Sequence, residues 1–179
     1  GVSTGALFLL IGMIYERTHS REISSYGGLA GILPKYSIAF FIILLSSIAV
    51  PMTNGFVGEF LILLGTYKVA PIYVYFAVTG VVLGAAYMLW MFKRVFFGKP
   101  GPLFTEGSHE YHDLSLREGV VLAPLLILSL WMGLLPQGFL RWSDKSVQHL
   151  VENKDNYYLE YLDLTGQSKT DSTEEAKKE

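Results

Sequence analysis

Four apolar segments follow one another along residues 1–140, and short charged links separate them. The third, Val69–Phe92, has 24 uncharged residues, and the fourth, Gly119–Leu140, has 22. An α-helix needs about 20 apolar residues to cross a hydrocarbon core of about 30 Å, so each of these two can span a membrane. Gly1–Tyr15 is too short to span by itself. The pattern predicts transmembrane helices over about 1–19, 36–67, 69–96 and 117–140.

The second segment, Tyr36–Tyr67, is too long for one straight membrane helix. Its 32 residues would extend about 48 Å at about 1.5 Å per residue, well beyond the hydrocarbon core. The run Pro51-Met52-Thr53-Asn54-Gly55 interrupts it, and a continuous α-helix disfavours Pro and Gly in its interior. We therefore expect an all-α membrane protein, a multi-spanning transmembrane helix bundle, with one discontinuous helix broken near Pro51–Gly55.

The character of the chain changes after residue 140. Hydrophobic residues make up 51% of the whole and charged residues only 17%, and the last 39 residues hold a dense mixture of Lys, Asp, Glu, Ser and Thr. We expect 141–164 to form an amphipathic or interfacial segment and 165–179 to be a disordered polar tail. No function for the tail after Leu150 follows from its sequence.

Charge, cysteine content and the start of the chain narrow the class further. A formal net charge of −2 argues against a nucleic-acid partner. Cys is absent, so the chain has neither disulfides nor thiolate metal ligands. Gly1 opens within an apolar run that lacks the basic start of a signal peptide, so we expect a chain cut out of something longer.

Basic residues are unevenly distributed among the links, which predicts an orientation. The second link has only Lys68. The first and third links are more basic, with Arg17, Arg21 and Lys35 in one and Lys93, Arg94, Lys99 and Arg117 in the other. Because cytoplasmic loops are enriched in Lys and Arg, these two links are expected on the cytoplasmic or matrix side. The C-terminal tail is then predicted on the periplasmic or intermembrane side.

Glu59 is the only charged residue in Tyr36–Tyr67. A charge at bilayer depth costs about 2.5–3.5 kcal/mol on insertion scales, and intramembrane acids commonly mark proton or ion pathways. Asn54, Gly55 and Gly58 precede it and suit an unwound turn open to water. Glu59 is therefore the candidate catalytic residue, a proton relay, with Pro51, Asn54, Gly55 and Gly58 supporting the path or the helix break. Two alternatives are an ion pair with a cation on a neighbouring helix and a position near the membrane interface.

The remaining candidates have weaker signals. Glu16, His19 and Lys68 are charges at segment ends, where protons could enter or where side chains simply meet the interface. A hydrophilic loop brings together His109, Glu110, His112 and Asp113. Two His three residues apart are nonspecific, so we expect no metal site. Phosphate-binding, dinucleotide-binding and nucleophile-elbow motifs are absent from the sequence, so we expect no cofactor on this chain.

Several strings together resemble a known family. They are Gly5-Ala-Leu-Phe-Leu-Leu-Ile-Gly-Met-Ile-Tyr-Glu-Arg-Thr-His19, Tyr26-Gly-Gly-Leu29, Asn54-Gly-Phe-Val-Gly-Glu-Phe-Leu-Ile-Leu63, Leu83-Gly-Ala-Ala-Tyr-Met-Leu-Trp90, Arg94-Val-Phe-Phe-Gly98, Leu116-Arg-Glu118 and Trp131-Met-Gly-Leu-Leu-Pro136. Residues 1–150 resemble the C-terminal part of the proton-translocating M chain, mitochondrial subunit 4, of respiratory complex I, an antiporter-like family.

The resemblance implies more than the residues show. It implies a subunit of NADH–quinone oxidoreductase in an energy-transducing membrane, the bacterial or mitochondrial inner membrane, with Glu59 as the acid of the discontinuous late helix. NADH, FMN, iron–sulfur clusters and quinone are expected in other subunits, with no redox chemistry on this chain. The implied partners are the other complex I membrane subunits, including adjacent antiporter-like subunits and the upstream part of the same subunit, together with the lipid bilayer.

Two other functions remain open from the sequence. The same scaffold occurs in subunits of cation/proton antiporters and membrane-bound hydrogenases. Several of those relatives carry Lys at the broken-helix position, so Glu59 discriminates modestly against them. The chain could also be a structural, non-conducting fragment of a split subunit.

Overall fold

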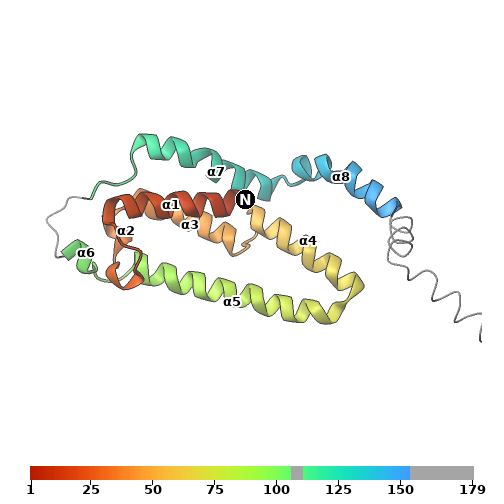
Figure 1. Ribbon diagram of the computed structural model, residues 1–179, viewed down its shortest axis with the longest axis horizontal. Helices are drawn as coiled ribbons and strands as arrows, with labels where there is room; N and C mark the ends of the chain where they lie inside the picture. The colour runs from red at the N-terminus through yellow and green to blue at the C-terminus, as the bar shows by residue number, and fades with distance from the viewer. Residues whose placement is uncertain (106–110, 154–179) are drawn as a thin grey trace, which may run out of the picture. The chain divides into compact units, whose positions relative to one another are not determined.

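The computed structural model describes residues 1–105 and 111–153, and every regular element among them is helical. Two compact units are present, residues 1–136 and the unit that starts at Gln137. The first unit contains α1 (Val2–Thr18), the 3₁₀ turn η1 (Ile23–Ser25), α2 (Leu29–Ile32), α3 (Pro34–Ser47), α4 (Asn54–Val69), α5 (Pro71–Phe96), α6 (Pro102–Thr105) and α7 (Leu116–Leu134). In Figure 1, α1 and α3 lie between α7 and the long α5.

Two helices are long and apolar enough to cross a membrane, α5 with 26 residues and α7 with 19. α5 begins at Pro71, whose fixed backbone suits the first helical position. α7 ends at Leu134, six residues before the end that the sequence predicts, because Pro136 disfavours a helical Leu135 and cannot donate a backbone hydrogen bond. The all-helical membrane fold that the apolar pattern predicts is confirmed.

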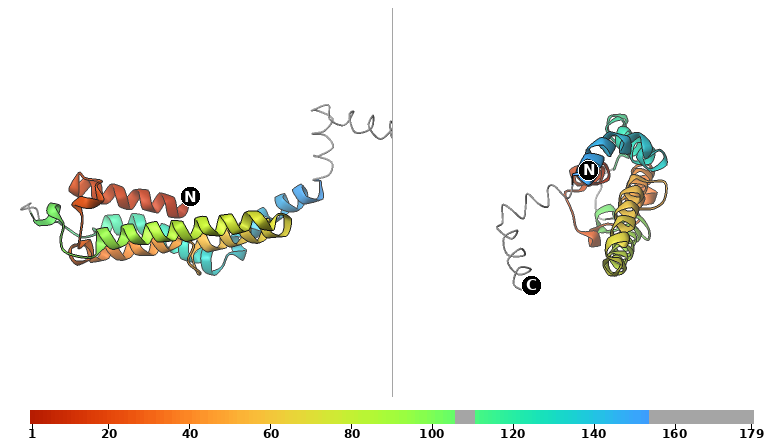
Figure 2. Two further views of the ribbon diagram at one scale, coloured as in Figure 1. Left: turned by 90° about the horizontal axis from the view of Figure 1, so that it is seen from below. Right: turned by 90° about the vertical axis from the view of Figure 1, so that its right-hand side faces the viewer.

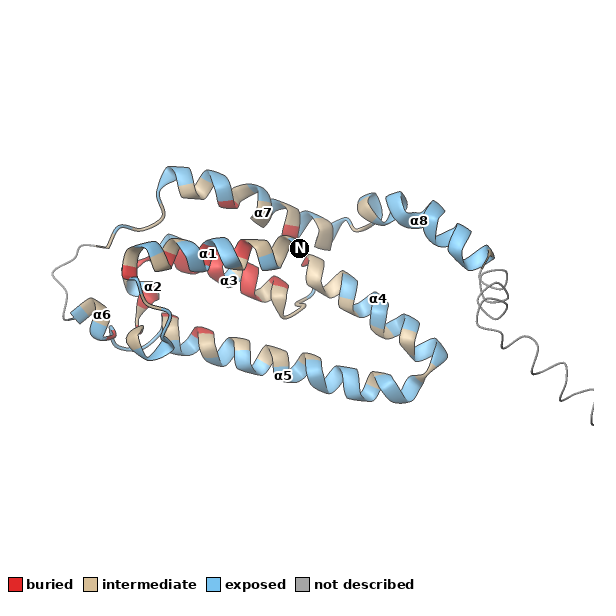
Figure 3. Cartoon of the chain, viewed as in Figure 1, coloured by how far each residue is buried: buried red, intermediate tan, exposed pale blue. Residues whose placement is uncertain are grey.

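The core of this unit is made by α1, α2 and α3, with the last turns of α5 and part of α7 (Figure 3). Its fully buried members include Ala6, Leu10, Ile43, Leu44, Phe96 and Leu122. Aromatic rings join α3 to α5: Phe40 lies 4.8 Å from Phe96, and Phe41 lies 5.1 Å from Phe92, centroid to centroid. Most of α4 and α5 remains exposed although it is apolar, as expected for surfaces that face lipid or other membrane helices.

The helix broken near Pro51–Gly55 is confirmed. α3 ends at Ser47 and α4 begins at Asn54, while Ala49 and Met52 take left-handed backbone conformations (φ 54° and 76°). At the end of α3, the Val50 N–H group donates to the carbonyl five residues earlier, that of Leu45 (3.1 Å). In Figure 2, α5 runs beside α3 and then beside α4, so one continuous helix accompanies both halves of the broken one.

Backbones approach each other closely around the break. A Cβ at Gly55 would collide with the Ser46 carbonyl oxygen, and one at Gly133 on α7 would collide with the Met52 carbonyl group. Only glycine fits such positions without movement of the neighbouring backbone. The break is therefore held from two sides, by the end of α3 and by the last turn of α7.

Polar contacts at the opposite ends of these helices join α1, α3 and α7. Arg17 Nη2 donates to Glu118 Oε2 (2.7 Å), and Arg17 Nε donates to the His112 carbonyl (3.1 Å). Asp113 accepts hydrogen bonds from the backbone N–H groups of Lys35 (2.9 Å) and Tyr36 (3.1 Å). Asp113 thus caps the start of α3 from 77 residues further along the chain.

The second unit is described as far as residue 153 and consists of α8 (Gln137–Glu152). Every residue of α8 except Phe139 is exposed within the structure. Residues 165–179, for which the sequence predicts a disordered tail, lie outside the described residues, and so do residues 154–164 of the predicted interfacial segment.

Candidate functional site

Glu59 lies in the second turn of α4 and faces a cavity of about 560 Å³. Four helices supply the lining, which consists of Thr4, Leu7, Ser47, Ile48, Glu59, Ala77, Gly80, Val81, Gly84, Ala85, Tyr87 and Met88. The two glycines and two alanines of α5 leave the space open opposite Glu59. A water molecule occupies about 30 Å³ in the liquid, so the cavity has room for on the order of ten waters.

The carboxylate of Glu59 has an unmet hydrogen-bonding demand. Its Oε2 is buried and has no hydrogen-bond partner among the described residues. No Lys or Arg from the described part of the chain lines the cavity. A buried carboxylate oxygen without donors is costly, because both lone pairs lose water without replacement. A water in the cavity or a proton on the carboxyl group would remove that cost.

A second polar group lies at the break itself and joins four helices. Asn54 Oδ1 at the start of α4 accepts from Ser3 of α1 (3.0 Å), Ser129 of α7 (3.0 Å) and Ser46 of α3. Ser46 Oγ lies 2.8 Å from Ser3 Oγ and 2.9 Å from Ser129 Oγ. Ser46 and Ser129 are almost completely buried, 1% and 0% exposed. We call Ser3, Ser46, Asn54 and Ser129 the break cluster.

Hydrogens are scarce in the break cluster. Its three hydroxyl groups carry one hydrogen each, yet five oxygen–oxygen pairs lie within hydrogen-bonding distance. At most three of the five can hold a full hydrogen bond at one time. The hydroxyl groups can therefore exchange partners without moving their oxygens. Ser3 and Ser46 directly precede Thr4 and Ser47, which line the Glu59 cavity, so the two polar groups are neighbours along α1 and α3.

The other predicted residues occupy different places. Pro51 is exposed within the break, and Gly58 is exposed with nothing near the position of a Cβ. The candidate entry charges lie at helix ends. Glu16 is exposed near the end of α1, and Lys68 is exposed at the end of α4.

His19 follows the last residue of α1 in a left-handed conformation (φ 50°), and the centroid of its ring lies 5.8 Å from that of Tyr15. The structure does not bring Glu16, His19 or Lys68 to the Glu59 cavity.

His112 and Asp113, which the sequence places in a possible metal loop, have structural contacts instead. The His112 carbonyl binds Arg17, and Asp113 caps α3. Burial alone would raise the pKa of Asp113. The backbone hydrogen bonds from Lys35, Leu114 and Tyr36, together with the charge of Lys35, outweigh burial and hold that pKa below its usual range. His109 and Glu110 lie outside the described residues.

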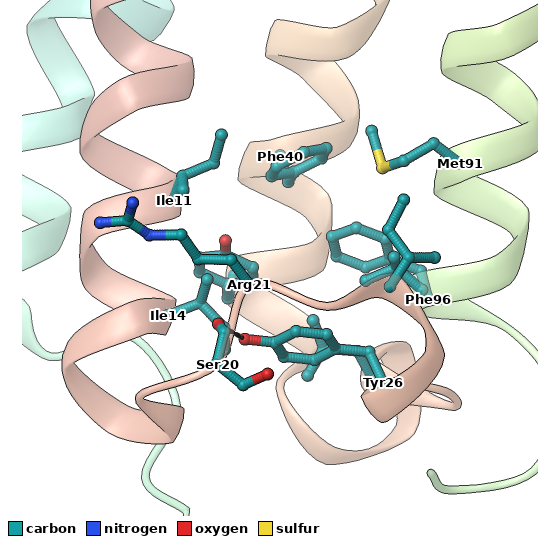
Figure 4. Close-up of a pocket in the computed structure, with 12 residues that line it drawn as sticks. Ile11, Ile14, Ser20, Arg21, Tyr26, Phe40, Met91 and Phe96 are labelled. Atoms are coloured by element: carbon teal, nitrogen blue, oxygen red, sulfur yellow. Dashed lines mark hydrogen bonds between the residues drawn. The ribbon is translucent and has the colours of Figure 1, made fainter. Parts of the chain in front are cut away.

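A separate pocket of about 340 Å³ lies among α1, α3 and α5 near the η1 turn (Figure 4). Its wall is largely apolar and aromatic, with Phe40, Met91 and Phe96 on the α3 and α5 sides. Arg21 lies at its edge, 4.5 Å above the Tyr15 ring. Among the described residues, no Asp or Glu lines this pocket.

Comparisons with known proteins indicate the family to which this chain is related. Residues 1–84 match the family model described as NADH:quinone oxidoreductase/Mrp antiporter, TM. NADH-quinone oxidoreductase subunit M of Rhodobacter capsulatus is 42% identical over 153 residues, which are 86% of this chain and 29% of that protein. The chain is a partial homologue of subunit M. NADH-ubiquinone oxidoreductase chain 4 of Arabidopsis thaliana is 39% identical over 153 residues, 86% of this chain and 30% of that protein.

A solved structure shares the fold as well as the sequence. A chain of respiratory complex I from Thermus thermophilus with bound NADH superposes with a TM-score of 0.67 and 39% identity. The match covers 78% of this chain and 28% of that chain. The chain thus spans about 30% of the length of the subunit M relatives it matches. The resemblance to complex I subunit M that the sequence strings carry is confirmed.

Sequence reasoning missed three of the four residues of the break cluster. Ser3, Ser46 and Ser129 are hydroxyl residues within apolar segments, and the first two each stand beside another hydroxyl residue. Such residues usually bond the carbonyl one turn earlier in their own helix, as Ser47 does with Ile43 (3.0 Å). One feature of the sequence could have indicated them. The side-chain oxygen of Asn54 at the helix break needs hydrogen-bond donors, and hydroxyl groups within the apolar segments can supply them.

Proposed function

We propose that this chain belongs to the membrane arm of respiratory complex I and that Glu59 relays protons there. The fold and the partial homology to subunit M support the assignment to the complex. The unpartnered, buried Glu59 Oε2 at a roomy cavity carries the relay proposal. Electron transfer from NADH through FMN and iron–sulfur clusters to quinone takes place in other subunits.

The relay works through two protonation states of one carboxyl group. A protonated Glu59 is neutral and avoids the cost of about 2.5–3.5 kcal/mol for a charge at membrane depth. Waters in the cavity, or a cation from a neighbouring part of the complex, stabilise the charged form and so draw the proton away. A change in neighbouring charge during the redox cycle then loads and unloads Glu59. The hydroxyls of Thr4, Ser47 and Tyr87 line the cavity and can orient the waters.

The broken helix gives this carboxyl group access to water. In a continuous helix, backbone groups are satisfied internally, whereas a break requires polar groups that also tolerate water. The break cluster supplies hydrogen-bond donors to the side-chain oxygen of Asn54, five residues before Glu59 on the same helix. We propose that it fixes where α4 begins and therefore how Glu59 faces the cavity.

Replacing Glu59 with Gln tests the relay. Gln keeps the shape and removes the exchangeable proton, so Glu59→Gln is expected to strongly reduce proton translocation per NADH oxidised while the complex still assembles. The measurement is pH-sensitive dye quenching in inverted membrane vesicles, with the NADH oxidation rate and the amount of assembled complex followed in parallel. Glu16→Gln is the matched control, because Glu16 is exposed and does not line the cavity.

The outcomes separate the two halves of the proposal. A normal ratio of protons to NADH in Glu59→Gln would refute the relay and leave the assignment to complex I standing. Copurification of the tagged chain without NADH-oxidising or quinone-reducing subunits would refute that assignment, whatever Glu59 does. Copurification with a hydrogenase or with an antiporter assembly would favour the alternative functions of the same scaffold.

A further inference from the structure

α8 has one apolar face that no described part of the chain is shown to cover. Positions separated by three, four or seven residues share one side of an α-helix. Leu140, Val147, Leu150 and Val151 fall on one side in this way, with exposed fractions of 39%, 53%, 60% and 61%. Asp144, four residues after Leu140 and three before Val147, lies at the edge of this side that borders the polar one. Arg141, Lys145, Gln148 and Glu152 repeat at the same spacing on the opposite side.

The position of α8 in the chain indicates what covers this face. Only Leu135 and Pro136 separate its first residue from the end of α7, which is long and apolar enough to cross a membrane. A helix that starts so soon after a membrane span starts at the level of the lipid headgroups. Its 16 residues extend only about 24 Å and include charged side chains, so it does not cross the hydrocarbon core itself.

The composition of α8 fits a bilayer surface better than a protein groove. Trp142, 84% exposed, lies at the border between the apolar and polar faces, and its ring is 6.0 Å from that of Phe139. Tryptophan is enriched at this depth in membranes because its ring is apolar and its N–H is polar. We propose that α8 lies in the plane of the membrane interface, with Leu140, Val147 and Leu150 toward the acyl chains. This inference requires α7 to span the membrane and does not depend on the role of Glu59.

Charge on α8 specifies the lipid requirement. Arg141 and Lys145 are balanced by Asp144 and Glu152, so the formal charge of the helix is zero with His149 neutral. Electrostatic attraction to anionic lipid therefore contributes little, and burial of the apolar face supplies the affinity. Phosphatidylcholine is expected to hold α8 as well as an anionic mixture does.

The absence of cysteine from the chain allows a direct test in native membranes. Single Cys residues are introduced on the apolar face (Val147→Cys, Leu150→Cys) and on the polar face (Lys145→Cys, Gln148→Cys) of the affinity-tagged full chain. Membrane fragments open on both sides are treated with polyethylene-glycol maleimide, and the gel shift of the tagged chain is followed over time. Lipid around a thiol raises its pKa, and a rise of about one unit lowers the reactive thiolate about tenfold. The apolar-face positions are therefore expected to react about tenfold or more slowly than the polar-face positions.

A photoreactive residue then distinguishes lipid from a protein partner. Leu150 is replaced with p-benzoylphenylalanine in the same membranes, and after irradiation the tagged chain is examined by gel and mass spectrometry. Adducts with phospholipid acyl chains are expected. A crosslinked protein band, a lack of lipid adducts, or equal maleimide labelling of both faces would each overturn the proposal. Because the polar-face variants alter only exposed residues, their yield in membranes reports whether the chain still inserts.

Discussion

In the break cluster, the cost of replacing a serine with alanine should not depend on how many partners that serine has. Ser46 lies within hydrogen-bonding distance of three partners and Ser129 of two. Each hydroxyl nevertheless supplies a single hydrogen. If Ser46 becomes Ala, Ser3 and Ser129 still donate to Asn54; if Ser129 becomes Ala, Ser3 and Ser46 do. Either substitution therefore removes one hydrogen bond, and the two should cost the same.

The magnitude follows from membrane-buried hydrogen bonds, which average about 0.6 kcal/mol. We expect Ser46→Ala and Ser129→Ala to lower the free energy of unfolding by about 0.6 kcal/mol each and the double variant by about 1.2 kcal/mol. Adding Ser3→Ala removes the last hydroxyl donor of Asn54 Oδ1. An unsatisfied, partly buried carbonyl oxygen costs about 1–3 kcal/mol, so the triple variant should lose distinctly more than three single steps.

Unfolding of the full chain in mixed micelles, with an increasing share of a denaturing detergent, gives these free energies when followed by circular dichroism. Ser47→Ala is the matched control, since Ser47 is the neighbouring residue and its hydroxyl bonds only the Ile43 carbonyl of its own helix in the structure. It should leave the free energy of unfolding almost unchanged. A loss for Ser46→Ala two to three times that for Ser129→Ala, or strict additivity through the triple variant, would contradict the shared-hydrogen reasoning.

Two further changes test the supports around the break and at the opposite end. Gly133→Ala forces a methyl group against the Met52 carbonyl and is expected to cost about 1–3 kcal/mol in detergent unfolding. Gly119→Ala on the same helix meets nothing and should stabilise by up to about 1 kcal/mol. Asp113→Asn should weaken the pH dependence of the free energy of unfolding at acidic pH. The lowered pKa of Asp113 means that its contribution is present above the ordinary carboxyl pKa and disappears as pH falls through the lowered one.

Equal losses for the two glycine substitutions would show that α7 does not press on the break. If Asp113→Asn leaves the pH dependence of the free energy of unfolding unchanged at acidic pH, the ionisation of Asp113 does not contribute to stability. Both measurements use the unfolding assay described for the serine variants, the second between about pH 2 and pH 7, which brackets ordinary carboxyl titration.

The apolar pattern predicts the fold class because lipid leaves a chain few choices. Backbone groups in hydrocarbon must be satisfied within a helix or a closed barrel, so long uncharged runs predict helices directly. Pro51 and Gly55 likewise predict the break from local chemistry alone. Gly133 carries no such signal, because its importance comes from the Met52 carbonyl, 81 residues earlier in the sequence. Asp113 lies in a hydrophilic loop whose sequence gives no sign of a cap, and it becomes a helix cap only through tertiary contact.

At the Glu59 site, too, some features can be predicted from the sequence and others cannot. One acid in an uncharged segment is visible in the sequence, and so is the need for a polar turn before it. The cavity is not, since it depends on Gly80, Gly84 and Ala85 of α5 lying opposite the carboxyl group. A pattern of small residues on one helix predicts close packing or open space equally well until its neighbour is known.

The cap of α3 by Asp113 also constrains the order of events during biosynthesis. A ribosome adds the residue that satisfies the Lys35 and Tyr36 N–H groups only after α3, α4 and α5 have all been made. Pro34 at the first helical position removes one of the orphan N–H groups in the meantime. Until Asp113 has been added, the N–H groups of Lys35 and Tyr36 must bond to water or to lipid headgroups, so the cap of α3 is completed only after α5 has been made.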